Sequence, residues 1–303
     1  MSRRYAAIDV GSNSVLLLVA ERDEGGRFSS VAEAMEMTRL GEGVDRTGRL
    51  TARAIEETVE AVRAFAEQAR SHGAADIAVV TTSAARDAEN GREFLERLRA
   101  VAGAEAEILS GEEEAALTYA SAAADFGQGP LWAIDIGGGS TEVIAGIGGS
   151  VRFRRSYDLG AVRLTERCVA SDPPAEEELL RVEEAVRMAL SDLEEPEEGA
   201  ELVGIAGTVT TLCAIDLGLD AYDAKRVHGR RMAFAAVREL ERKLARMRLQ
   251  ERLEIPGLPR RRADVIVAGA VILRAAMEHL GFSEVIVSDK GVRWGLLETR
   301  FGR

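Results

Sequence analysis

The chain has 303 residues, 46% hydrophobic and 30% charged, which is the composition of an ordinary globular protein large enough for two domains. Its two cysteines lack the spacing of a zinc site or a disulfide framework, and its net charge of −12 argues against a general nucleic-acid binder. There is no signal peptide and no apolar run long enough to span a membrane, so we expect a cytoplasmic protein that binds neither membranes nor nucleic acids.

The first part of the chain predicts three strands followed by alternating helices and strands. Short apolar runs bounded by Gly, Asn and Ser indicate the strands, and apolar residues at helical spacing indicate the helices. The breaker that begins at Phe126 marks the predicted boundary between domains 1–126 and 127–303. In chain order we expect strands at 5–10, 14–21 and 27–36, a helix at 51–71, a strand at 77–81, a helix at 83–100, a strand at 105–109 and a helix through Glu113 and Tyr119.

The second part repeats this order. The expected elements are strands at 131–136, 141–147 and 151–157, a helix from 161, an acidic helix at 175–194, a strand at 201–206, a helix opened by Thr208, helices at 233–248 and 261–280, a strand at 284–288 and a last helix from Gly291. The order βββαβαβα, twice over, predicts an α/β protein of two ribonuclease H-like domains with a cleft between them. The last helix is a candidate to pack back on the N-terminal domain.

The central segment 131–146, LWAIDIGGGSTEVIAG, has a counterpart near the N-terminus. Residues 5–20, YAAIDVGSNSVLLLVA, align with it after a shift of 126 positions, which places Asp9 on Asp135. Each copy reads as a strand that ends in an acid, a Gly-rich turn and a returning strand. Two such copies indicate two related halves that hold a phosphate between their turns.

The Gly-rich turns suit an anion, because glycine has no Cβ to keep a phosphate away from the backbone N–H groups. Asp135, at the end of its strand, could hold a divalent cation beside that anion, since magnesium prefers carboxylate, water and phosphate oxygens. A single Gly-rich turn is equally typical of a plain β-hairpin. The repeat is therefore what favours a phosphate site.

Seven motifs resemble, in order along the chain, the exopolyphosphatase/guanosine pentaphosphate phosphohydrolase family of the actin-like ATPase superfamily. They are IDVGSNS, TSAARDAEN, SGEEEAA, IDIGGGSTE, GIAGTVTT, RRRADVIVAGA and SDKGVRWGLL. The resemblance covers essentially the whole chain. It implies an enzyme that removes the terminal phosphoryl group of inorganic polyphosphate, or the 5′-γ-phosphate of guanosine pentaphosphate, with Mg2+ as cofactor and Mn2+ as the alternative metal.

The resemblance also implies a role for particular residues. Glu113 would be the base that activates water. The metal ligands would be Asp135 and Glu142, with Asp9 acting through water. The phosphate contacts would come from Gly11, Ser12, Asn13, Ser14, Arg86, Gly137, Gly138, Gly139, Ser140, Gly207 and Thr208.

Without the resemblance, three of these assignments have an equally simple structural reading. The glutamate run 112–114 is typical of favourable charge at a helix start. Arg86 could be a surface arginine paired with Asp87 or Glu89. Gly207 and Thr208 could simply begin a helix.

Several functions stay open within this resemblance. Longer relatives carry an additional helical C-terminal region and this chain stops at Arg303, so short polyphosphates are expected as substrates, with nucleoside di- or triphosphates as further candidates. The alternatives are a guanosine pentaphosphate phosphohydrolase, a small-molecule kinase of the same superfamily, and a non-catalytic sensor of polyphosphate or alarmone. A homodimer is compatible with the family.

Basic residues outside the motifs could track a long polyanion. Individually, each is more typical of a solvated surface charge. These residues are Arg39, Lys225, Arg226, Arg230 and Arg231.

Overall fold

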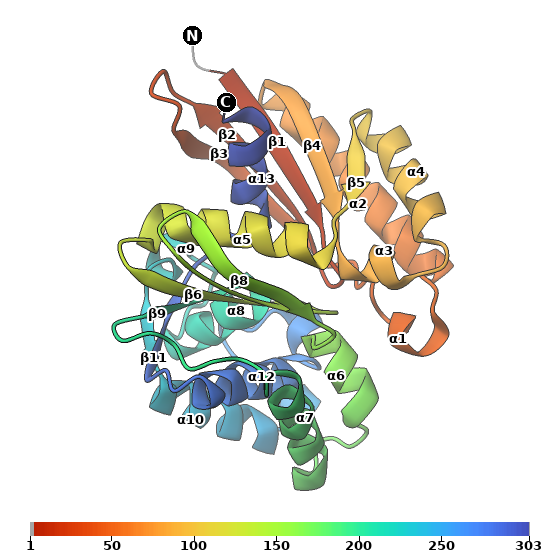
Figure 1. Cartoon of the computed structure of the whole chain (residues 1–303). Coiled ribbons are helices and arrows are strands. Elements are labelled where there is room, and N and C mark those ends of the chain that lie inside the picture. Colours follow the sequence, from red (N-terminus) through yellow and green to blue (C-terminus); the bar gives the residue numbers. More distant parts are fainter. Residues whose placement is uncertain (1–2, 303) are drawn as a thin grey trace. The chain divides into compact units, whose positions relative to one another are not determined.

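The computed structural model describes residues 3–302, which form two compact units. Unit 1 comprises Met1–Ser121 and Val292–Arg303, and unit 2 comprises Ala122–Gly291. The division falls inside helix α5 (Gly111–Phe126), whereas the sequence places the boundary at the end of this helix. The C-terminal helix α13 (Val292–Phe301) belongs to unit 1 (Figure 1).

Unit 1 is built on a five-stranded sheet with the strand order β3-β2-β1-β4-β5. β1, β2 and β3 are antiparallel neighbours, and β4 and β5 run parallel to β1. The carboxyl ends of β1, β4 and β5 therefore meet at one edge of the sheet. The elements are β1 (Arg3–Val10), β2 (Val15–Arg22), β3 (Phe28–Glu36), α1 (Val44–Thr47), α2 (Ala52–Ser71), β4 (Ala74–Thr81), α3 (Ser83–Asp87), α4 (Gly91–Ala102), β5 (Ala106–Ile108), the start of α5, and α13.

The sheet of unit 1 is apolar on both faces, because successive side chains of a strand point to opposite sides. Leu17 packs with Phe94 of α4 in one core cluster. Its neighbour Leu18 packs with Leu296 of α13 in another. The buried Arg293 fixes α13 to the sheet by donating a hydrogen bond of 2.9 Å to the Leu17 carbonyl. The C-terminal helix thus covers a face of the N-terminal sheet.

Unit 2 is built on a six-stranded sheet with the order β10-β11-β9-β6-β7-β8. From β8 to β11 this order repeats that of unit 1, with β9 and β11 parallel to β6, and β10 adds an antiparallel edge. The elements are β6 (Pro130–Ile136), β7 (Thr141–Ile147), β8 (Ser150–Tyr157), α6 (Ala161–Cys168), α7 (Glu176–Ala189), β9 (Glu201–Ile205), α8 (Ala206–Asp216), α9 (Ala224–Val227), β10 (Arg231–Ala233), α10 (Phe234–Arg246), α11 (Leu249–Arg252), the 3-10 helix η1 (Arg260–Arg262), α12 (Ile266–His279) and β11 (Glu284–Val287).

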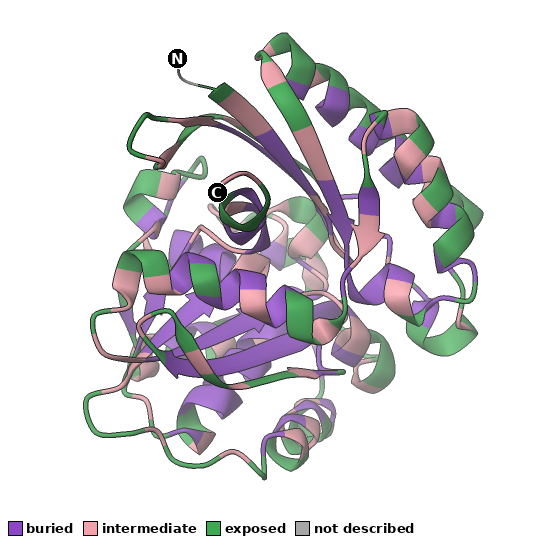
Figure 2. Cartoon of the chain, turned by 45° about the horizontal axis from the view of Figure 1, so that its top comes forward, coloured by how far each residue is buried: buried purple, intermediate pink, exposed green. Residues whose placement is uncertain are grey.

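Helix α12 is the central helix of the unit 2 core, since it is buried along nearly its whole length. Figure 2 shows this concentration of buried residues on the strands and on the helices against them. The one cation of α12 before its last turn, Arg274, is buried and contacts Glu183, Glu241 and Glu278 at 2.6, 2.8 and 2.8 Å. These contacts join α12 to α7 and α10. No helix among residues 3–302 is both long and apolar enough to cross a bilayer.

The predicted helix at 83–100 is wrong, because it is two helices. The first helix ends at Asp87. The Asn90 side chain then accepts a hydrogen bond from the Leu50 N–H at 2.9 Å and donates one to the Leu50 carbonyl at 3.0 Å. A Cβ at Gly91 would lie 1.9 Å from the Ala85 carbonyl oxygen, so the second helix begins where glycine allows this approach.

A second predicted helix is also divided in the structure, and one short strand was not predicted. The predicted helix at 261–280 is the 3-10 helix η1 followed by α12. The sequence also missed β10, whose three residues pair with β11. A strand this short has no periodicity to read.

Candidate active site

Loop 2 (Gly137–Ser140), which follows β6, is closed by a hydrogen bond of 3.0 Å from the Gly137 N–H to the Ser140 carbonyl. Its carbonyls point toward the start of α6. The Gly137 carbonyl accepts a hydrogen bond from the Ala161 N–H, and the Gly138 carbonyl accepts one from the Val162 N–H, each at 2.9 Å. The Gly139 carbonyl accepts a hydrogen bond from the Arg163 Nε at 2.6 Å. In a trans peptide the C=O and the next N–H point in opposite directions. The N–H groups of residues 138–140 therefore face away from α6, in the manner of backbone turns that can accept an anion.

Gly160 allows α6 to come this close. A Cβ at this position would lie 2.1 Å from the Gly138 carbonyl oxygen. The backbone of Gly160 is extended, so the requirement for glycine is the close approach and not a special φ. No local sequence pattern marks Gly160, because only the tertiary contact gives this residue a role.

Loop 1 (Gly11–Ser14) has the same closure, from the Gly11 N–H to the Ser14 carbonyl at 3.0 Å. Segment 39–41 takes the place of α6. The Arg39 N–H donates to the Asn13 carbonyl at 3.1 Å and the Gly41 N–H to the Ser12 carbonyl at 2.7 Å. By the same peptide geometry the N–H groups of residues 13 and 14 point the other way. The internal repeat of the sequence is therefore also a repeat of backbone conformation.

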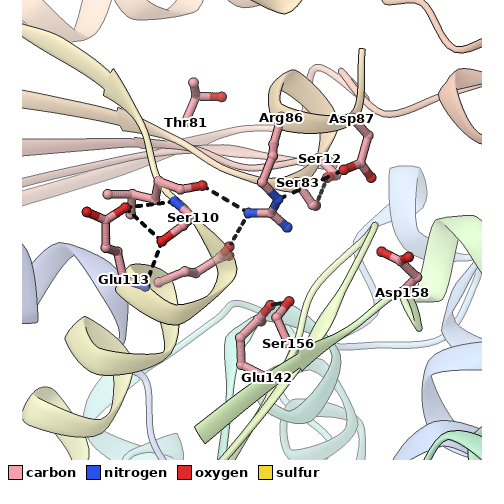
Figure 3. Close-up of polar contacts among 12 residues, drawn as sticks. Ser12, Thr81, Ser83, Arg86, Asp87, Ser110, Glu113, Glu142, Ser156 and Asp158 are labelled. Atoms are coloured by element: carbon pink, nitrogen blue, oxygen red, sulfur yellow. Dashed lines mark hydrogen bonds and ion pairs between the residues drawn. The ribbon is translucent and has the colours of Figure 1, made fainter.

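Loops 1 and 2 differ in the side chains at their two middle positions, which are Ser12 and Asn13 in loop 1 and Gly138 and Gly139 in loop 2. The Ser12 hydroxyl lies 2.8 Å from the Ser83 hydroxyl at the start of α3 (Figure 3). The Asn13 Oδ1 is buried and accepts no hydrogen bond from the described residues. Loop 1 thus has polar side chains at positions 12 and 13, where loop 2 has Gly138 and Gly139.

Two carboxylates flank loop 2. Asp135 of β6 and Glu142 of β7 are directly opposite partners in the antiparallel ladder, so their side chains share one face of the sheet. They are 7% and 1% exposed. Glu142 accepts a hydrogen bond of 2.6 Å from the Ser156 hydroxyl (Figure 3). The β6–β7 ladder thus brings two carboxyl groups together at a nearly inaccessible position.

The equivalent position in unit 1 has only one carboxylate. Asp9 of β1 is opposite Leu16. Asp9 lies in unit 1 and the pair of Asp135 and Glu142 in unit 2, so the three predicted ligands are not one cluster within either unit. Among residues 3–302 no three His, Cys, Asp or Glu side chains gather as a metal site.

Arg86, on α3, lies at the same edge of the unit 1 sheet as loop 1, because β4 ends beside β1. Its guanidinium donates to the Leu109 carbonyl at 3.0 Å and to the Glu114 carboxylate at 3.4 Å (Figure 3). Asp87 is more distant, at 3.9 Å from Nε. The nearer carboxylate partner of Arg86 is therefore Glu114, which the sequence indicates only as favourable charge at the start of a helix.

Glu113 has a structural partner of its own. Its carboxylate accepts hydrogen bonds from the Ser110 N–H at 2.9 Å and the Ser110 hydroxyl at 2.8 Å, and the hydroxyl in turn accepts from the Glu113 N–H at 3.2 Å. This is a capping box at the start of α5. These bonds lower the pKa of Glu113. Figure 3 shows Glu113 turned back toward Ser110. The spacing Ser-x-x-Glu is readable in the sequence and was the signal for this role.

Gly207 and Thr208 lie in the first turn of α8, and β9 ends beside β6 at the edge that carries loop 2. The helix begins at Ala206, whose φ of 67° is a left-handed value that costs a non-glycine residue energy. Arg262 donates to the Gly207 carbonyl at 3.1 Å, and a Cβ at Gly207 would lie 2.2 Å from its Nη2. Burial lowers the pKa of Arg262 to about 10, so it stays charged at neutral pH.

Each unit thus gathers a different subset of the predicted site residues at the carboxyl edge of its sheet. Unit 1 brings together loop 1, Arg86 and the start of α5 with Glu113 and Glu114. Unit 2 brings together loop 2, its two carboxylates and the start of α8. This is the edge at which open α/β sheets bind ligands.

Comparison with known proteins identifies relatives over the whole chain. A sequence profile of the Ppx/GppA phosphatase family matches residues 18–301. The chain is 37% identical to Exopolyphosphatase 2 of Mycobacterium tuberculosis, over 97% of both chains. It is 31% identical to Exopolyphosphatase 1 of Mycobacterium leprae, over 97% of this chain and 88% of that protein.

A solved structure gives the same answer. The crystal structure of the Ppx/GppA family member from Aquifex aeolicus matches with a TM-score of 0.84 and 34% identity, over 99% of this chain and 97% of that chain. The predicted α/β fold of the actin-like ATPase superfamily is therefore confirmed. The chain belongs to the Ppx/GppA phosphatase family.

Proposed function

We propose that this protein is an exopolyphosphatase that hydrolyses the terminal phosphoanhydride of inorganic polyphosphate with magnesium. The observation that carries this proposal is loop 2, where outward backbone N–H groups lie beside the opposed carboxylates Asp135 and Glu142. The name of the 37% identical relative from Mycobacterium tuberculosis supports the substrate. Water attacks the terminal phosphorus, the bridging P–O bond breaks, and orthophosphate leaves the shortened chain.

The donor set of unit 2 fits magnesium. This ion is usually held by one or two carboxylates, with water and substrate phosphate completing its six ligands. Asp135 and Glu142 would supply the carboxylates, and when bound the ion neutralises developing charge on the phosphate oxygens. Within unit 2 the N–H groups of loop 2 would hold phosphate oxygens. Within unit 1 the N–H groups of loop 1 and the forked guanidinium of Arg86 are donors of the same kind.

For the base we infer Glu114 in place of Glu113. The Glu113 carboxylate caps its own helix, and its lowered pKa makes it a weaker acceptor for the proton of water. Glu114 is 8% exposed and contacts Arg86, a residue predicted to bind phosphate. A carboxylate in that position can orient water and take its proton as the P–O bond breaks.

The test compares Glu114→Gln with Glu113→Gln in phosphate release from tripolyphosphate, with and without magnesium. Loss of a general base costs about 100-fold or more, and this loss is expected for Glu114→Gln. Glutamine at position 113 still fits a capping box, so Glu113→Gln should stay within about threefold of wild type. The reverse pattern would assign the base to Glu113 as the sequence predicted.

Three substrates separate the proposed function from its alternatives. Release from polyphosphate that needs magnesium supports the proposal, and the ratio of rates on short and long chains tests the expected preference for short ones. Release from guanosine pentaphosphate alone would make the protein an alarmone phosphohydrolase. Transfer from ATP to a small acceptor would make it a kinase.

A further inference from the structure

The charge of this acidic chain is unevenly distributed. Thirteen of its 39 Lys and Arg residues, but only four of its 51 Asp and Glu residues, lie between Lys225 and Arg262. This segment runs from α9 through β10, α10 and α11 to η1, all in unit 2. A strongly basic segment in a chain with a net charge of −12 needs an explanation beyond composition.

The cations of α10 gather on one side of that helix. Val237, Leu240 and Leu244 are buried and pack toward the core. At 100° per residue, the opposite side carries four exposed cations, which we call the basic face, together with Glu239. The basic face consists of Arg238, Arg242, Lys243 and Arg246.

The basic face is not neutralised within unit 2. In the part of the chain that the structure describes, no ion pair joins any of its four side chains to a carboxylate. The nearby Glu241 points elsewhere, to Arg274 at 2.8 Å. Most other surface arginines do have carboxylate partners, such as Arg97 with Glu56 at 2.7 Å.

Helix stability explains only part of this arrangement. Cations in the last turn of a helix interact favourably with its dipole, which accounts for Lys243 and Arg246. Arg238 and Arg242 lie earlier, and like charges four residues apart destabilise a helix by roughly 0.2–0.5 kcal/mol per pair. The spacing 238, 242, 246 contains two such pairs. The row of cations thus costs the helix stability and suits an external polyanion.

We propose that the basic face of α10 binds the distal part of a long inorganic polyphosphate chain. The proposal rests on the proposed function, which brings the end of that chain to loop 2 in the same unit. Helix α8 starts at the edge of the sheet that carries loop 2 and packs against α10. Phosphates beyond the reacting end could therefore follow unit 2 to the basic face. This departs from the expected preference for short chains.

The chemistry of the face favours polyphosphate over other polyanions. Single-stranded nucleic acids bind on aromatic platforms, and the segment 225–262 has one aromatic residue, Phe234, which is partly buried under Arg238. A membrane-surface helix needs large apolar residues at its exposed boundary, and the outer side of α10 has only charged residues and alanine. A flexible chain of bare phosphates needs only a row of cations.

The experiment compares wild type with the fourfold variant R238Q/R242Q/K243Q/R246Q. A matched control, R53Q/R63Q/R97Q/R187Q, removes the same charge from four exposed arginines that each have a carboxylate partner. Binding of a labelled polyphosphate of about 100 phosphates is measured in EDTA, without turnover, across a salt series. Tripolyphosphate hydrolysis is measured in parallel, and circular dichroism checks folding.

The basic-face variant should bind the long chain at least about tenfold more weakly and with a shallower salt dependence, because fewer counterions are released. Its kcat/KM for tripolyphosphate should stay within about twofold of wild type, and the control should match wild type in both assays. If the fourfold variant does not fold, R242Q/R246Q should show the same loss at about threefold.

Equal binding by both variants, or equal losses in both, would overturn the proposal. So would a larger loss for single-stranded RNA or anionic vesicles than for polyphosphate. Binding of polyphosphate without any hydrolysis would refute the proposed function and leave the binding result readable, since that assay needs no turnover.

Discussion

Loops 1 and 2 share a backbone conformation and differ in the side chains that surround it. Both close with a hydrogen bond of 3.0 Å from the glycine N–H to the serine carbonyl three residues later, and in both a neighbouring segment takes the carbonyls. Loop 2 has three glycines before its serine and lies between two opposed carboxylates, Asp135 and Glu142. Loop 1 has Ser12 and Asn13 at the middle positions, and Asp9 before it is opposite Leu16, the position equivalent to Glu142. The repeat therefore preserves the backbone conformation of the turn and places the carboxylate pair in only one half.

The largest expected effect tests that asymmetry. Asp135→Asn should lower magnesium-dependent phosphate release by about 1000-fold, since a metal supplies several kcal/mol of charge stabilisation. Asp9→Asn should cost about tenfold or less, because Asp9 has no carboxylate opposite. Magnesium titrations of both variants measure this. Equal losses, with equal shifts in metal dependence, would mean that both halves hold the metal.

The next largest expected effect is on stability, and it is tested on one buried arginine from each unit. Arg274 contacts three carboxylates and Arg293 one, Glu33 at 3.2 Å. Breaking a buried ion pair costs about 3–5 kcal/mol, so Arg274→Met should destabilise unit 2 by this amount and Arg293→Met should destabilise unit 1 by less.

The chain has one tryptophan in each unit, which separates the two measurements. Trp132 belongs to unit 2 and Trp294 to unit 1. Urea unfolding followed by fluorescence in Trp294→Phe and Trp132→Phe backgrounds reports each unit in turn. A larger loss for Arg293→Met would contradict the ranking.

Gly160 and Gly41 let neighbouring segments approach loop 2 and loop 1, and they differ in how close an added Cβ would come to the loop. A Cβ at Gly160 would meet the backbone of loop 2 at 2.1 Å, whereas one at Gly41 would meet the Ser12 side chain of loop 1 at 2.9 Å. Gly160→Ala should therefore displace loop 2 by an ångström or so and lower kcat/KM by about 100-fold, and Gly41→Ala should cost less. Steady-state kinetics on tripolyphosphate, with thermal unfolding as the control, decide this, and a greater loss for Gly41→Ala would refute it.

The smallest expected effect is on the pH dependence of stability, and it is tested on two glutamates that cap helices. The Ser171 hydroxyl and the N–H groups of Ala175 and Ala170 lower the pKa of Glu178 from 4.5 to about 2. The resulting stability is complete above the unfolded pKa and is lost as pH falls from about 4.5 to 2. Glu178→Gln should cost about 1 kcal/mol at pH 7 and flatten this acid limb.

Glu113 is the matched control in unit 1, because its carboxylate accepts hydrogen bonds from a single residue, Ser110, whereas that of Glu178 accepts from Ala170, Ser171 and Ala175. Glu113→Gln should change stability at pH 7 by a few tenths of a kcal/mol. Urea midpoints between pH 2 and 7 measure both variants. An unchanged acid limb in Glu178→Gln would remove the role assigned to that carboxylate.

Local signals in the sequence were sufficient for both loops and for the strands before them. The 126-residue repeat placed Asp9 and Asp135 at strand ends, and the structure agrees. The roles of the residues at the start of α5 were harder to predict, because the sequence does not distinguish three adjacent glutamates. Their directions depend on Ser110 and Arg86, which only the folded unit brings near.

The sequence by itself determined the strand–turn–strand repeat, the α/β class and the family, because these depend on local periodicity and on ordered motifs. Tertiary structure decided which carbonyls brace each loop, which glutamate of α5 turns to its own cap, and which unit receives the last helix. Those outcomes depend on contacts between residues far apart in the chain, such as Gly160 against Gly138 or Arg293 against Leu17, and no local pattern encodes them.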